Sequence, residues 1–378
     1  MSRRTNRRQF IQQSALAGIG FWAAGGLTAQ ESKSANGKLR FACIGVGGKG
    51  SSDTDHVAAL GDVVALCDID DNFLNRKAAG EKFKNAKKYN DFRKMLEEMS
   101  KDIDAVTVST PDHMHAPAAV MAMKMGKHVY CQKPLCHDVY EARVMRETAD
   151  KMKIATSMGN QGTANATLRT GVEVIQSGAL GAIKEVHCWT NRPVWPQAPK
   201  ITSRPKPEEP PAHVHWDLWL GTAPVRPYSG EKQYNNHPPY HDFNWRGWWD
   251  FGTGALGDMA CHTMNMPFMA LKLGYPESIV AECGDLNPET YPSWATVTYQ
   301  YPARGSLPPL KFVWYEGQKD GKKNLPPLDL LQGEQPSGSA SLIIGEKGTM
   351  YSPADYGERW VLLPKKQFEG FVNPKPTL

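Results

Sequence analysis

The chain has 378 residues, of which 40% are apolar, and carries a formal net charge of +5 at pH 7. A chain of this length exceeds one typical domain and favours two. No basic run is interleaved with aromatic residues, so no nucleic-acid partner is expected. The seven cysteines are odd in number and show no repeated spacing, which argues against a disulfide framework and against structural zinc.

The start of the chain has the features of an export signal. A basic region is followed by an apolar stretch, residues 15–29, that is shorter than the ~20 apolar residues of a membrane span. Residues 6–11 (Asn-Arg-Arg-Gln-Phe-Ile) resemble the twin-arginine box of bacterial Tat signals. We therefore expect residues 1–30 to be a Tat-type signal peptide that engages the Tat translocase, leaving a periplasmic or otherwise exported protein without a stable membrane span. An uncleaved anchor or a disordered tail is the alternative.

Predicted strands and helices alternate between residues 38 and 158. Apolar runs predict strands at 38–44, 63–67, 105–109, 128–131 and 154–158, and the segments between them predict helices at 50–60, 72–84, 91–98, 116–125 and 138–152. This alternation predicts an α/β domain with a doubly wound parallel sheet of the Rossmann type. In such a sheet the ligand lies beyond the carboxyl ends of the strands.

A G-x-G-x-x-G motif follows the first predicted strand. Gly45 allows the tight turn, Gly47 lets the backbone approach a pyrophosphate, and Gly50 lets the next helix pack on the sheet. Asp68 ends the second strand, where a carboxylate accepts hydrogen bonds from the adenosine ribose and would repel a 2′-phosphate. The motif in this context predicts a dinucleotide site that takes NAD rather than NADP.

Five further positions follow predicted strand ends. Thr110 and Pro111 are expected to line the ribose side of the cofactor, and His115 to pack beneath it unless its role is structural. Asn160 and Gln161 are expected near the nicotinamide, where their amides can contact the carboxamide or a sugar. Ordinary turn chemistry is the alternative for these two amides.

The pattern changes in the second half, residues 159–378, which we assign to a substrate-binding α/β domain. A helix is predicted at 168–177, and strands at 183–190, 278–283, 294–301, 310–315 and 341–344. The segment 191–251 is rich in Pro, Trp, His and Tyr, and it is long for a structureless loop. That length indicates function or partner contact.

A helix beginning near Gly257 carries two side chains suited to proton transfer. Asp258 and His262 are four residues apart and share one helical face. His262 can take a proton from a carbinol oxygen because imidazole titrates near neutral pH. Asp258 can stabilise the imidazolium or contact a substrate hydroxyl. A surface pair or a buried structural pair is the alternative.

The order of these motifs resembles the Gfo/Idh/MocA family, the glucose–fructose oxidoreductase and inositol dehydrogenase group. The resemblance rests on the glycine motif and on the segments Val-Ser-Thr-Pro-Asp-His-Met-His (108–115), Gln-Lys-Pro (132–134) and Gly-Thr-Gly-Ala-Leu-Gly-Asp-Met-Ala-Cys-His (252–262). It extends from about residue 39 to 348 and fits Tat-exported members. The family usually has Glu-Lys-Pro, so Gln132 is a departure.

The resemblance implies a C-terminal α+β domain with an open, mostly antiparallel sheet, whose free face favours homo-oligomers. It also implies that Lys133 lies beside the cofactor and the substrate hydroxyl, where its ammonium lowers the pKa of a neighbouring base. Members usually finish with helices that return to the Rossmann domain. No such helix is predicted before Leu378, so we expect a shortened C-terminus.

Aromatic residues of the segment 191–251 are candidate substrate contacts. Sugars stack their C–H faces on indoles and accept hydrogen bonds from arginine, which favours Trp195, Arg246, Trp248 and Trp249. Loop anchoring or an oligomer contact is the alternative for the tryptophans. Four histidines of the segment lack a compact ligand spacing, so no metal is predicted: His213, His215, His237 and His241.

Together these features predict an exported NAD-dependent oxidoreductase. A sugar, sugar derivative or cyclic polyol gives hydride to a tightly bound nicotinamide, while Lys133, Asp258 and His262 handle the proton. One alternative is redox-assisted glycoside cleavage, which needs a further base such as Tyr240. The other is a non-catalytic sugar-binding relative, which only the departure at Gln132 favours.

Overall fold

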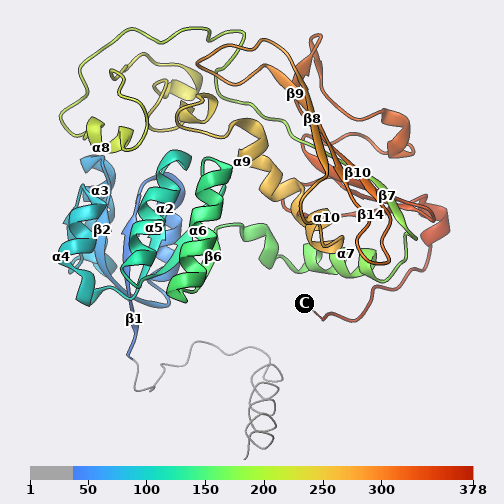
Figure 1. Ribbon diagram of the computed structural model, residues 1–378, viewed down its shortest axis with the longest axis horizontal. Coiled ribbons are helices and arrows are strands. Elements are labelled where there is room, and N and C mark those ends of the chain that lie inside the picture. Colours follow the sequence, from blue (N-terminus) through green and yellow to red (C-terminus); the bar gives the residue numbers. More distant parts are fainter. Residues whose placement is uncertain (1–36, 378) are drawn as a thin grey trace, which may run out of the picture. The chain divides into compact units, whose positions relative to one another are not determined.

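The computed structural model describes residues 37–377, so the expected signal segment 1–30 lies outside the described residues. The chain divides between Leu39 and Arg40, and the second unit, Arg40–Leu378, holds nearly all of the elements described below (Figure 1). Among the described residues, no helix is both long and apolar enough to cross a membrane.

The N-terminal part of the second unit is a parallel sheet, as predicted, with six strands where five were expected. The strands lie in the order β3-β2-β1-β4-β5-β6. They are β1 (Leu39–Ile44), β2 (Gly61–Cys67), β3 (Lys87–Tyr89), β4 (Ala105–Val108), β5 (His128–Cys131) and β6 (Thr156–Met158). Its helices are α2 (Gly48–Val57), α3 (Asp71–Ala78), α4 (Phe92–Glu98), α5 (His115–Lys124) and α6 (Val139–Met152).

Both faces of the central strands of this sheet are buried, which explains their continuous apolar sequences. In β1, Phe41 and Cys43 belong to one hydrophobic cluster, whereas the alternating Ala42 and Ile44 belong to another. Successive strand residues point to opposite faces, so helices cover the sheet on both sides. The short edge strand β3 was not predicted, because Lys-Lys-Tyr contains no apolar run.

The C-terminal sheet is mostly antiparallel, and this confirms the predicted fold class. Its strands lie in the order β14-β13-β12-β7-β10-β9-β8, with β11 paired to β10, and β7 runs parallel to β10. They are β7 (Ile183–Trp189), β8 (Ser278–Cys283), β9 (Trp294–Tyr301), β10 (Leu310–Lys319), β11 (Lys322–Lys323), β12 (Ala340–Gly345), β13 (Thr349–Ser352) and β14 (Val361–Leu363).

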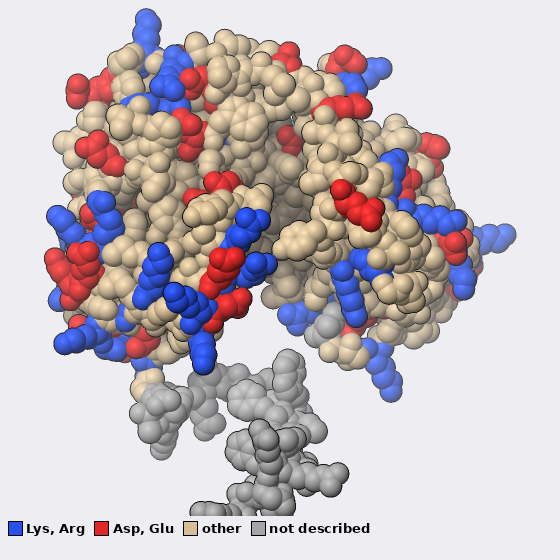
Figure 2. All heavy atoms as spheres, viewed as in Figure 1, with Lys and Arg blue, Asp and Glu red and all other residues tan. Residues whose placement is uncertain are grey.

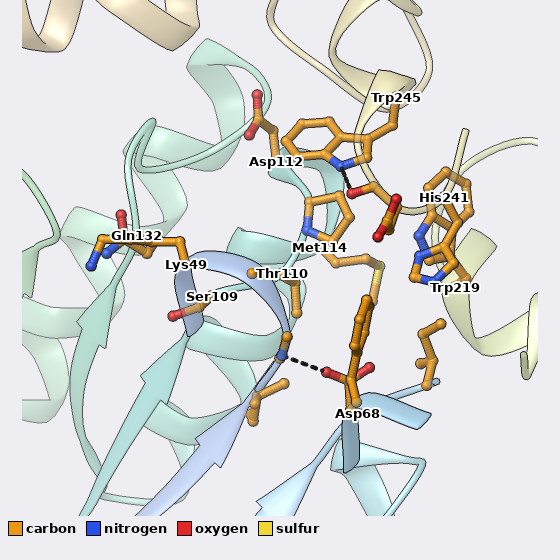
Figure 3. Close-up of a pocket in the computed structure, with 18 of the residues that line it drawn as sticks. Lys49, Asp68, Ser109, Thr110, Asp112, Met114, Gln132, Trp219, His241 and Trp245 are labelled. Carbon is orange, nitrogen blue, oxygen red and sulfur yellow. Dashed lines mark hydrogen bonds between the residues drawn. The ribbon is translucent and has the colours of Figure 1, made fainter. Parts of the chain in front are cut away.

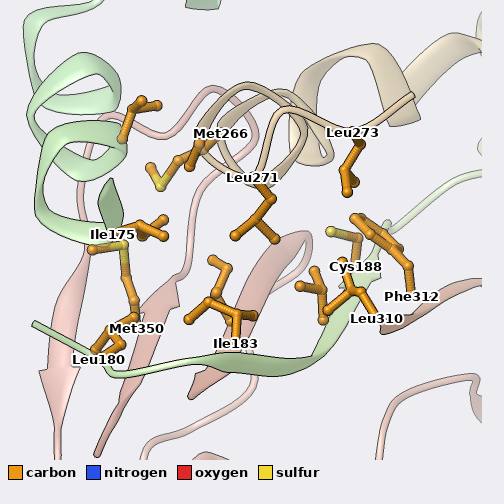
Figure 4. Packing of buried hydrophobic residues seen from close by; sticks show 14 of the residues in the cluster. Ile175, Leu180, Ile183, Cys188, Met266, Leu271, Leu273, Leu310, Phe312 and Met350 are labelled. Carbon is orange, nitrogen blue, oxygen red and sulfur yellow. The ribbon is translucent and has the colours of Figure 1, made fainter. Parts of the chain in front are cut away.

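Helices α7 (Ala166–Gln176), α9 (Gly254–Thr263) and α10 (Asn265–Ala270) cover one face of this sheet. Figure 4 shows Met266 and Leu271 from the helical side meeting Ile183, Leu310 and Phe312 of the strands. This core fixes α9, and α9 carries Asp258 and His262.

A long segment between β7 and α9 lies against the carboxyl end of β2. We call residues 205–253 the strap; it contains the short helix α8 (Trp216–Leu220). The Asp71 amide donates to the His213 carbonyl at 2.9 Å, and the His215 amide donates to the Ile69 carbonyl at 2.9 Å. Buried Trp, Tyr and Phe rings give the strap a core of its own. The strap therefore covers the edge of the Rossmann sheet where a dinucleotide is expected.

Candidate active site

Each glycine of the motif sits where a side chain cannot fit. Gly45 has φ +76°, and a Cβ there would lie 2.6 Å from the Ser109 carbonyl oxygen. A Cβ at Gly50 would overlap the Gly45 carbonyl oxygen, so Gly50 permits helix packing without lining the cavity. A Cβ at Gly47 would lie 2.5 Å from the Phe73 ring. The turn thus exposes bare backbone at the start of α2, which favours anions.

The Asp68 carboxylate lies directly against this turn (Figure 3). Its Oδ2 accepts from the amides of Val46 and Gly47 at 2.8 and 3.1 Å, and its Oδ1 accepts from the Asp70 amide at 3.0 Å. Burial raises the pKa of Asp68, and the backbone donors oppose that effect. The carboxylate is therefore held at the end of β2 where ribose hydroxyls are expected.

A cavity of about 410 Å³ opens between the strand ends and the strap. It is lined by most of the expected cofactor residues: Gly45, Gly47, Asp68, Thr110, Pro111, His115 and Lys133. The strap closes it with Trp219, His241, Phe243 and Trp245, and Figure 3 shows three of these side chains beside the cavity. The hydroxyl of Thr110 is buried there without a hydrogen-bond partner. The glycine turn, the Asp68 acceptor and this unpaired hydroxyl fit a dinucleotide.

His115 holds two loops of the cavity together. Its Nε2 lies 2.7 Å from the Thr110 carbonyl oxygen, and its Nδ1 lies 2.6 Å from the Pro134 carbonyl oxygen. Both contacts are to backbone acceptors, so the ring ties the loop after β4 to the loop that carries Lys133. This is a positioning role beside the cavity.

Lys133 and Asp258 form an ion pair in the lining of the cavity. The Lys133 Nζ donates to the Asp258 Oδ1 at 2.8 Å and to the Asp258 carbonyl oxygen at 2.9 Å. Arg246 Nε lies 3.6 Å from Oδ1, and Arg192 Nε lies 3.8 Å from Oδ2. Burial alone would raise the pKa of Asp258, but the three cations hold it below its usual range. Burial likewise opposes the charge of Lys133, yet Asp258 keeps the pKa of Lys133 raised.

His262 is a neutral imidazole oriented by Asn160. Its Nδ1 lies 2.9 Å from the Asn160 Oδ1, while the Asn160 Nδ2 donates to the Cys261 carbonyl at 2.6 Å. With the amide fixed in this way, Nδ1 carries the proton and Nε2 is left as the basic nitrogen. Burial lowers the pKa of His262 to about 4, and Lys133 adds to that shift. Asp258 is directed to Lys133 and makes no hydrogen bond to His262.

Two residues near this pair were not predicted from the sequence. Arg192 follows β7 in a proline-rich segment with no recognisable motif. The ring of Tyr356 lies 4.6 Å from the His262 ring, edge to face, and Tyr356 is within electrostatic reach of Lys133 and Asp258. Only the fold brings these separated positions together, so no sequence signal identifies them.

Several expected contacts lie away from the cavity. Gln161 is exposed at the start of a 3₁₀ helix. Trp195 and Trp248 are 4% and 0% exposed, so their indoles pack in the interior. Trp249 stacks on Tyr291, with ring centroids 3.8 Å apart. Arg246 does line the cavity, and Trp219 and Trp245 supply the indole faces there. A tryptophan in a core cannot be told from one in a cavity by sequence.

The histidines of the strap lie beside carboxylates, and two of them, His241 and His213, face the same Asp70. His241 Nε2 lies 2.9 Å from the Asp70 Oδ2, and His215 Nε2 lies 3.3 Å from the Asp71 Oδ1. His237 Nδ1 lies 2.5 Å from the Asp242 Oδ1. The pairs with Asp70 and Asp71 join the strap to the start of α3, and the His237–Asp242 pair links two residues within the strap. Within residues 37–377, no group of three or more such side chains is arranged to hold a metal.

Family models match both parts of the chain. An oxidoreductase family model with an NAD-binding Rossmann fold matches residues 39–160, and the model of that family's C-terminal alpha/beta domain matches residues 165–307.

Curated relatives match part of the chain. A glycosyl hydrolase family 109 protein of Solibacter usitatus is 32% identical over 161 residues, which cover 39% of this chain and 37% of the relative. Inositol 2-dehydrogenase of Salmonella typhimurium is 30% identical over 162 residues, which cover 39% of this chain and 45% of the relative. The chain thus spans less than half the length of these two relatives.

Solved structures share the fold at low identity. Levoglucosan dehydrogenase in complex with NADH and levoglucosan superposes with a TM-score of 0.57 at 17% identity, covering 86% of this chain and 75% of that one. An inositol dehydrogenase homologue of Azotobacter vinelandii, complexed with NADH and myo-inositol, superposes with a TM-score of 0.57 at 18% identity. The superposition covers 86% of this chain and 73% of that one. Since the two family models together match more than half of the chain, the protein belongs to the Gfo/Idh/MocA oxidoreductase family.

Proposed function

We propose that the protein oxidises a sugar, sugar derivative or cyclic polyol with a tightly bound NAD. The observation that carries this proposal is that the Lys133–Asp258 pair lines the same cavity as the glycine turn and Asp68. A cofactor site and a proton-handling site thus share one cavity. The carboxylate of Asp68 favours NAD over NADP, because it would repel a 2′-phosphate.

The protein's contribution is orientation and proton handling. When bound, the nicotinamide accepts hydride from the carbinol carbon. Neutral His262 takes the carbinol proton on Nε2, since Asn160 occupies Nδ1. The Lys133 ammonium donates to the carbinol oxygen and stabilises the negative charge that develops there. Asp258 fixes the position of that ammonium.

A second candidate function is redox-assisted glycoside cleavage with no net oxidation. It needs a further acid or base, and Tyr240 does not suit that role because it is 1% exposed inside the strap core. Tyr356 suits it better, because its ring lies beside His262 and its hydroxyl has no hydrogen-bond partner among the described residues. The relative called a glycosyl hydrolase family 109 protein supports this alternative.

The non-catalytic alternative loses its main support. Gln132 donates from Nε2 to the buried Asp53 Oδ2 at 2.8 Å. The departure from the family pattern is therefore explained by a neighbouring carboxylate, which needs a hydrogen-bond donor at position 132. Lys133 and Asp258 line the cavity, whereas His262, one helical turn after Asp258 on α9, is 3% exposed and does not line it. Export by the Tat route rests on the twin-arginine segment, and assembly into homo-oligomers rests on the exposed Ile279 and Val280 of β8.

The test uses the purified mature protein. The bound nucleotide is released and identified, and the absorbance of reduced nicotinamide is then recorded while sugars, polyols and glycosides are added. We expect bound NAD that one carbohydrate class reduces. A ketosugar product supports the dehydrogenase, whereas a free sugar and aglycone support glycoside cleavage. Absence of nucleotide would overturn both.

A variant of Lys133 tests its role in catalysis separately from its effect on folding and nucleotide binding. Lys133→Met should retain the nucleotide but reduce it at least ~100-fold more slowly, because the donor to the carbinol oxygen is lost. Lys94→Met, an exposed change on α4, is the matched control. Full turnover by Lys133→Met would contradict the assignment.

A further inference from the structure

Three cations surround Asp258: Lys133 and Arg246 line the cavity together with it, and Arg192 approaches it from outside the lining. Among the described residues, Asp258 is the carboxylate within 4.0 Å of a side-chain nitrogen of Lys133, of Arg192 and of Arg246, and no other carboxylate comes this close to any of the three. Only Lys133 lies at hydrogen-bond distance, 2.8 Å. The two guanidinium groups therefore interact with Asp258 through charge alone and make no hydrogen bond to it.

Both guanidinium groups keep free donors. One guanidinium nitrogen of Arg192 donates a hydrogen bond to the Asn191 side chain. One guanidinium nitrogen of Arg246 donates to the Phe243 carbonyl at 3.0 Å. Their other N–H groups have no protein acceptor in the described part of the chain. Their side chains are 26% and 25% exposed, so a ligand can reach them. A guanidinium with a free edge is suited to a planar carboxylate, which it binds through two parallel hydrogen bonds.

The surrounding charge does not neutralise these arginines. Asp112 is the other carboxyl within electrostatic reach of Arg246, but it is buried and accepts from the Thr253 amide and hydroxyl at 3.1 and 2.6 Å. Even with Asp112 counted as ionised, three cations face two carboxylates. Over the face drawn in Figure 2, acidic and basic side chains are intermixed, so this local excess is not a general property of that surface.

Both arginines are held by rigid backbone. The Arg192 amide donates to the Thr190 hydroxyl at 3.3 Å, and its carbonyl accepts from the Gly317 amide of β10 at 3.0 Å. The Arg246 guanidinium lies 4.2 Å from the Trp245 ring centroid. A Cβ at Gly252 would lie 2.7 Å from the Arg246 Cα, so the chain is closely packed there. Positions fixed before binding cost little entropy on binding.

We propose that the substrate carries a carboxylate, as a uronic or aldonic acid or its glycoside does, and that Arg192 and Arg246 bind it. Lys133 and His262 are left to face the carbinol. This inference rests on the proposed function, because it assigns the substrate class of that same site. A monoanion suits the site better than a phosphate dianion, since Asp258 lies against the same guanidinium groups.

The test measures equilibrium binding to the cofactor-loaded protein. Calorimetry compares D-glucuronate with D-glucose and D-glucuronamide, and likewise the galacto and manno series, with glucose 6-phosphate as the phosphate probe. We expect at least one uronate to bind ~10-fold or more tightly than its neutral partners, as charge-assisted hydrogen bonds predict. The preference should weaken as salt is added. Equal or tighter binding of the neutral partner in every series, no uronate binding, or tighter binding of the phosphate would overturn the proposal.

Arginine variants locate the carboxylate. Arg192→Gln should lower the affinity for the uronate more than the affinity for the neutral sugar and so remove most of the uronate preference, and Arg192→Lys should restore only part of it because the fork is lost. Arg204→Gln is the matched control, since Arg204 pairs with Glu289 at 2.8 Å and makes no ion pair with Asp258. An unchanged preference in Arg192→Gln would contradict the assignment.

The two proposals fail in different ways. If a neutral sugar binds and reduces the bound nicotinamide better than its uronate, the oxidoreductase proposal stands and the carboxylate proposal is overturned. If uronates bind tightly through Arg192 but never reduce the nicotinamide, the binding inference stands and the oxidoreductase proposal fails.

Discussion

Asp53 on α2 is a buried carboxylate that collects donors from three parts of the Rossmann domain. It accepts from Lys49 of its own helix, from the Ser109 hydroxyl at 2.9 Å and from the Gln132 amide at 2.8 Å. Figure 3 shows Lys49, Ser109 and Gln132 gathered on one side of the cavity. The glutamate usual in the family at position 132 would face Asp53 directly. The amide is therefore the residue that this neighbour requires, and it also precedes Lys133.

Restoring the family's glutamate should harm this protein. Gln132→Glu places two carboxylates at hydrogen-bond distance, so one must be protonated or displaced, and we expect a loss of ~1–3 kcal/mol in the free energy of unfolding at neutral pH. The pair would have a raised pKa in the folded state. The loss should therefore shrink as the pH falls toward the ordinary carboxyl range.

Urea unfolding of the cofactor-loaded protein at several pH values measures this effect. The double variant Asp53→Asn/Gln132→Glu is the matched control, because it exchanges the amide and the carboxylate and should recover most of the stability. Gln132→Glu with unchanged stability at neutral pH would show that the contact with Asp53 does not constrain position 132.

The strap is the element that distinguishes the cavity from an open Rossmann cleft. Its backbone pairs with residues 69–71, and His241 reaches the Asp70 carboxylate, which also accepts from the Asn72 amide at the start of α3. The strap is thus joined to the part of the sheet that carries Asp68. An element attached at this place can slow the release of a dinucleotide bound beneath it.

Removing one attachment should loosen the cofactor. His241→Ala abolishes the contact with Asp70 and opens the wall of the cavity, and we expect the dinucleotide to dissociate ~10-fold faster. The measurement is the nucleotide retained after gel filtration and the rate of its release into excess competitor. His56→Ala, on the exposed face of α2, is the control. Equal retention by the two variants would mean that the strap does not hold the cofactor.

The elements differ in how far the sequence could predict them. Strands such as β1 and β4 are continuous apolar runs between helices, so their type and order follow from pattern alone. The glycine turn and Asp68 follow from position on those strands. The place of the strap could not be predicted, because a high content of proline and aromatic residues does not indicate which surface a segment packs against. Arg192 and Tyr356 approach Asp258 only through β-sheet pairing and loop packing over long sequence separations.

Across the whole second unit, buried neutral histidines join segments that are distant in sequence. His113 follows β4, and its Nε2 lies 2.9 Å from the Trp219 carbonyl oxygen while its amide donates to the Phe251 carbonyl at 3.2 Å. Burial lowers the pKa of His113 to about 4. Glu316 in the C-terminal sheet is the opposite case, because burial raises its pKa to about 7. The two groups make stability depend on pH with opposite signs.

The sign of each group's effect on stability follows from whether the folded or the unfolded protein binds more protons. Below its ordinary pKa of 6.5, His113 is protonated in the unfolded chain but not in the folded protein, so acidification toward pH 4 favours unfolding, by ~3 kcal/mol for a shift of this size. Glu316 takes up its proton near pH 7 when folded but only near 4.5 when unfolded, so acidification over that range favours folding. Other buried carboxyls, Asp68 and Asp112 among them, share the direction of Glu316.

Because the wild-type profile sums these opposing contributions, the prediction concerns differences between variants. Relative to wild type, His113→Gln should lose less stability between pH 6.5 and 4, since no imidazole remains to be protonated on unfolding. Glu316→Gln should lose more between pH 7 and 4.5, since the stabilising protonation is gone. Unfolding free energies measured across this range, with exposed His56→Gln as the control, decide the matter. Parallel profiles for all four proteins would mean that neither buried group titrates as its surroundings require, whereas opposite deviations would show that burial at these two sites contributes to the acid stability of the molecule with opposite signs.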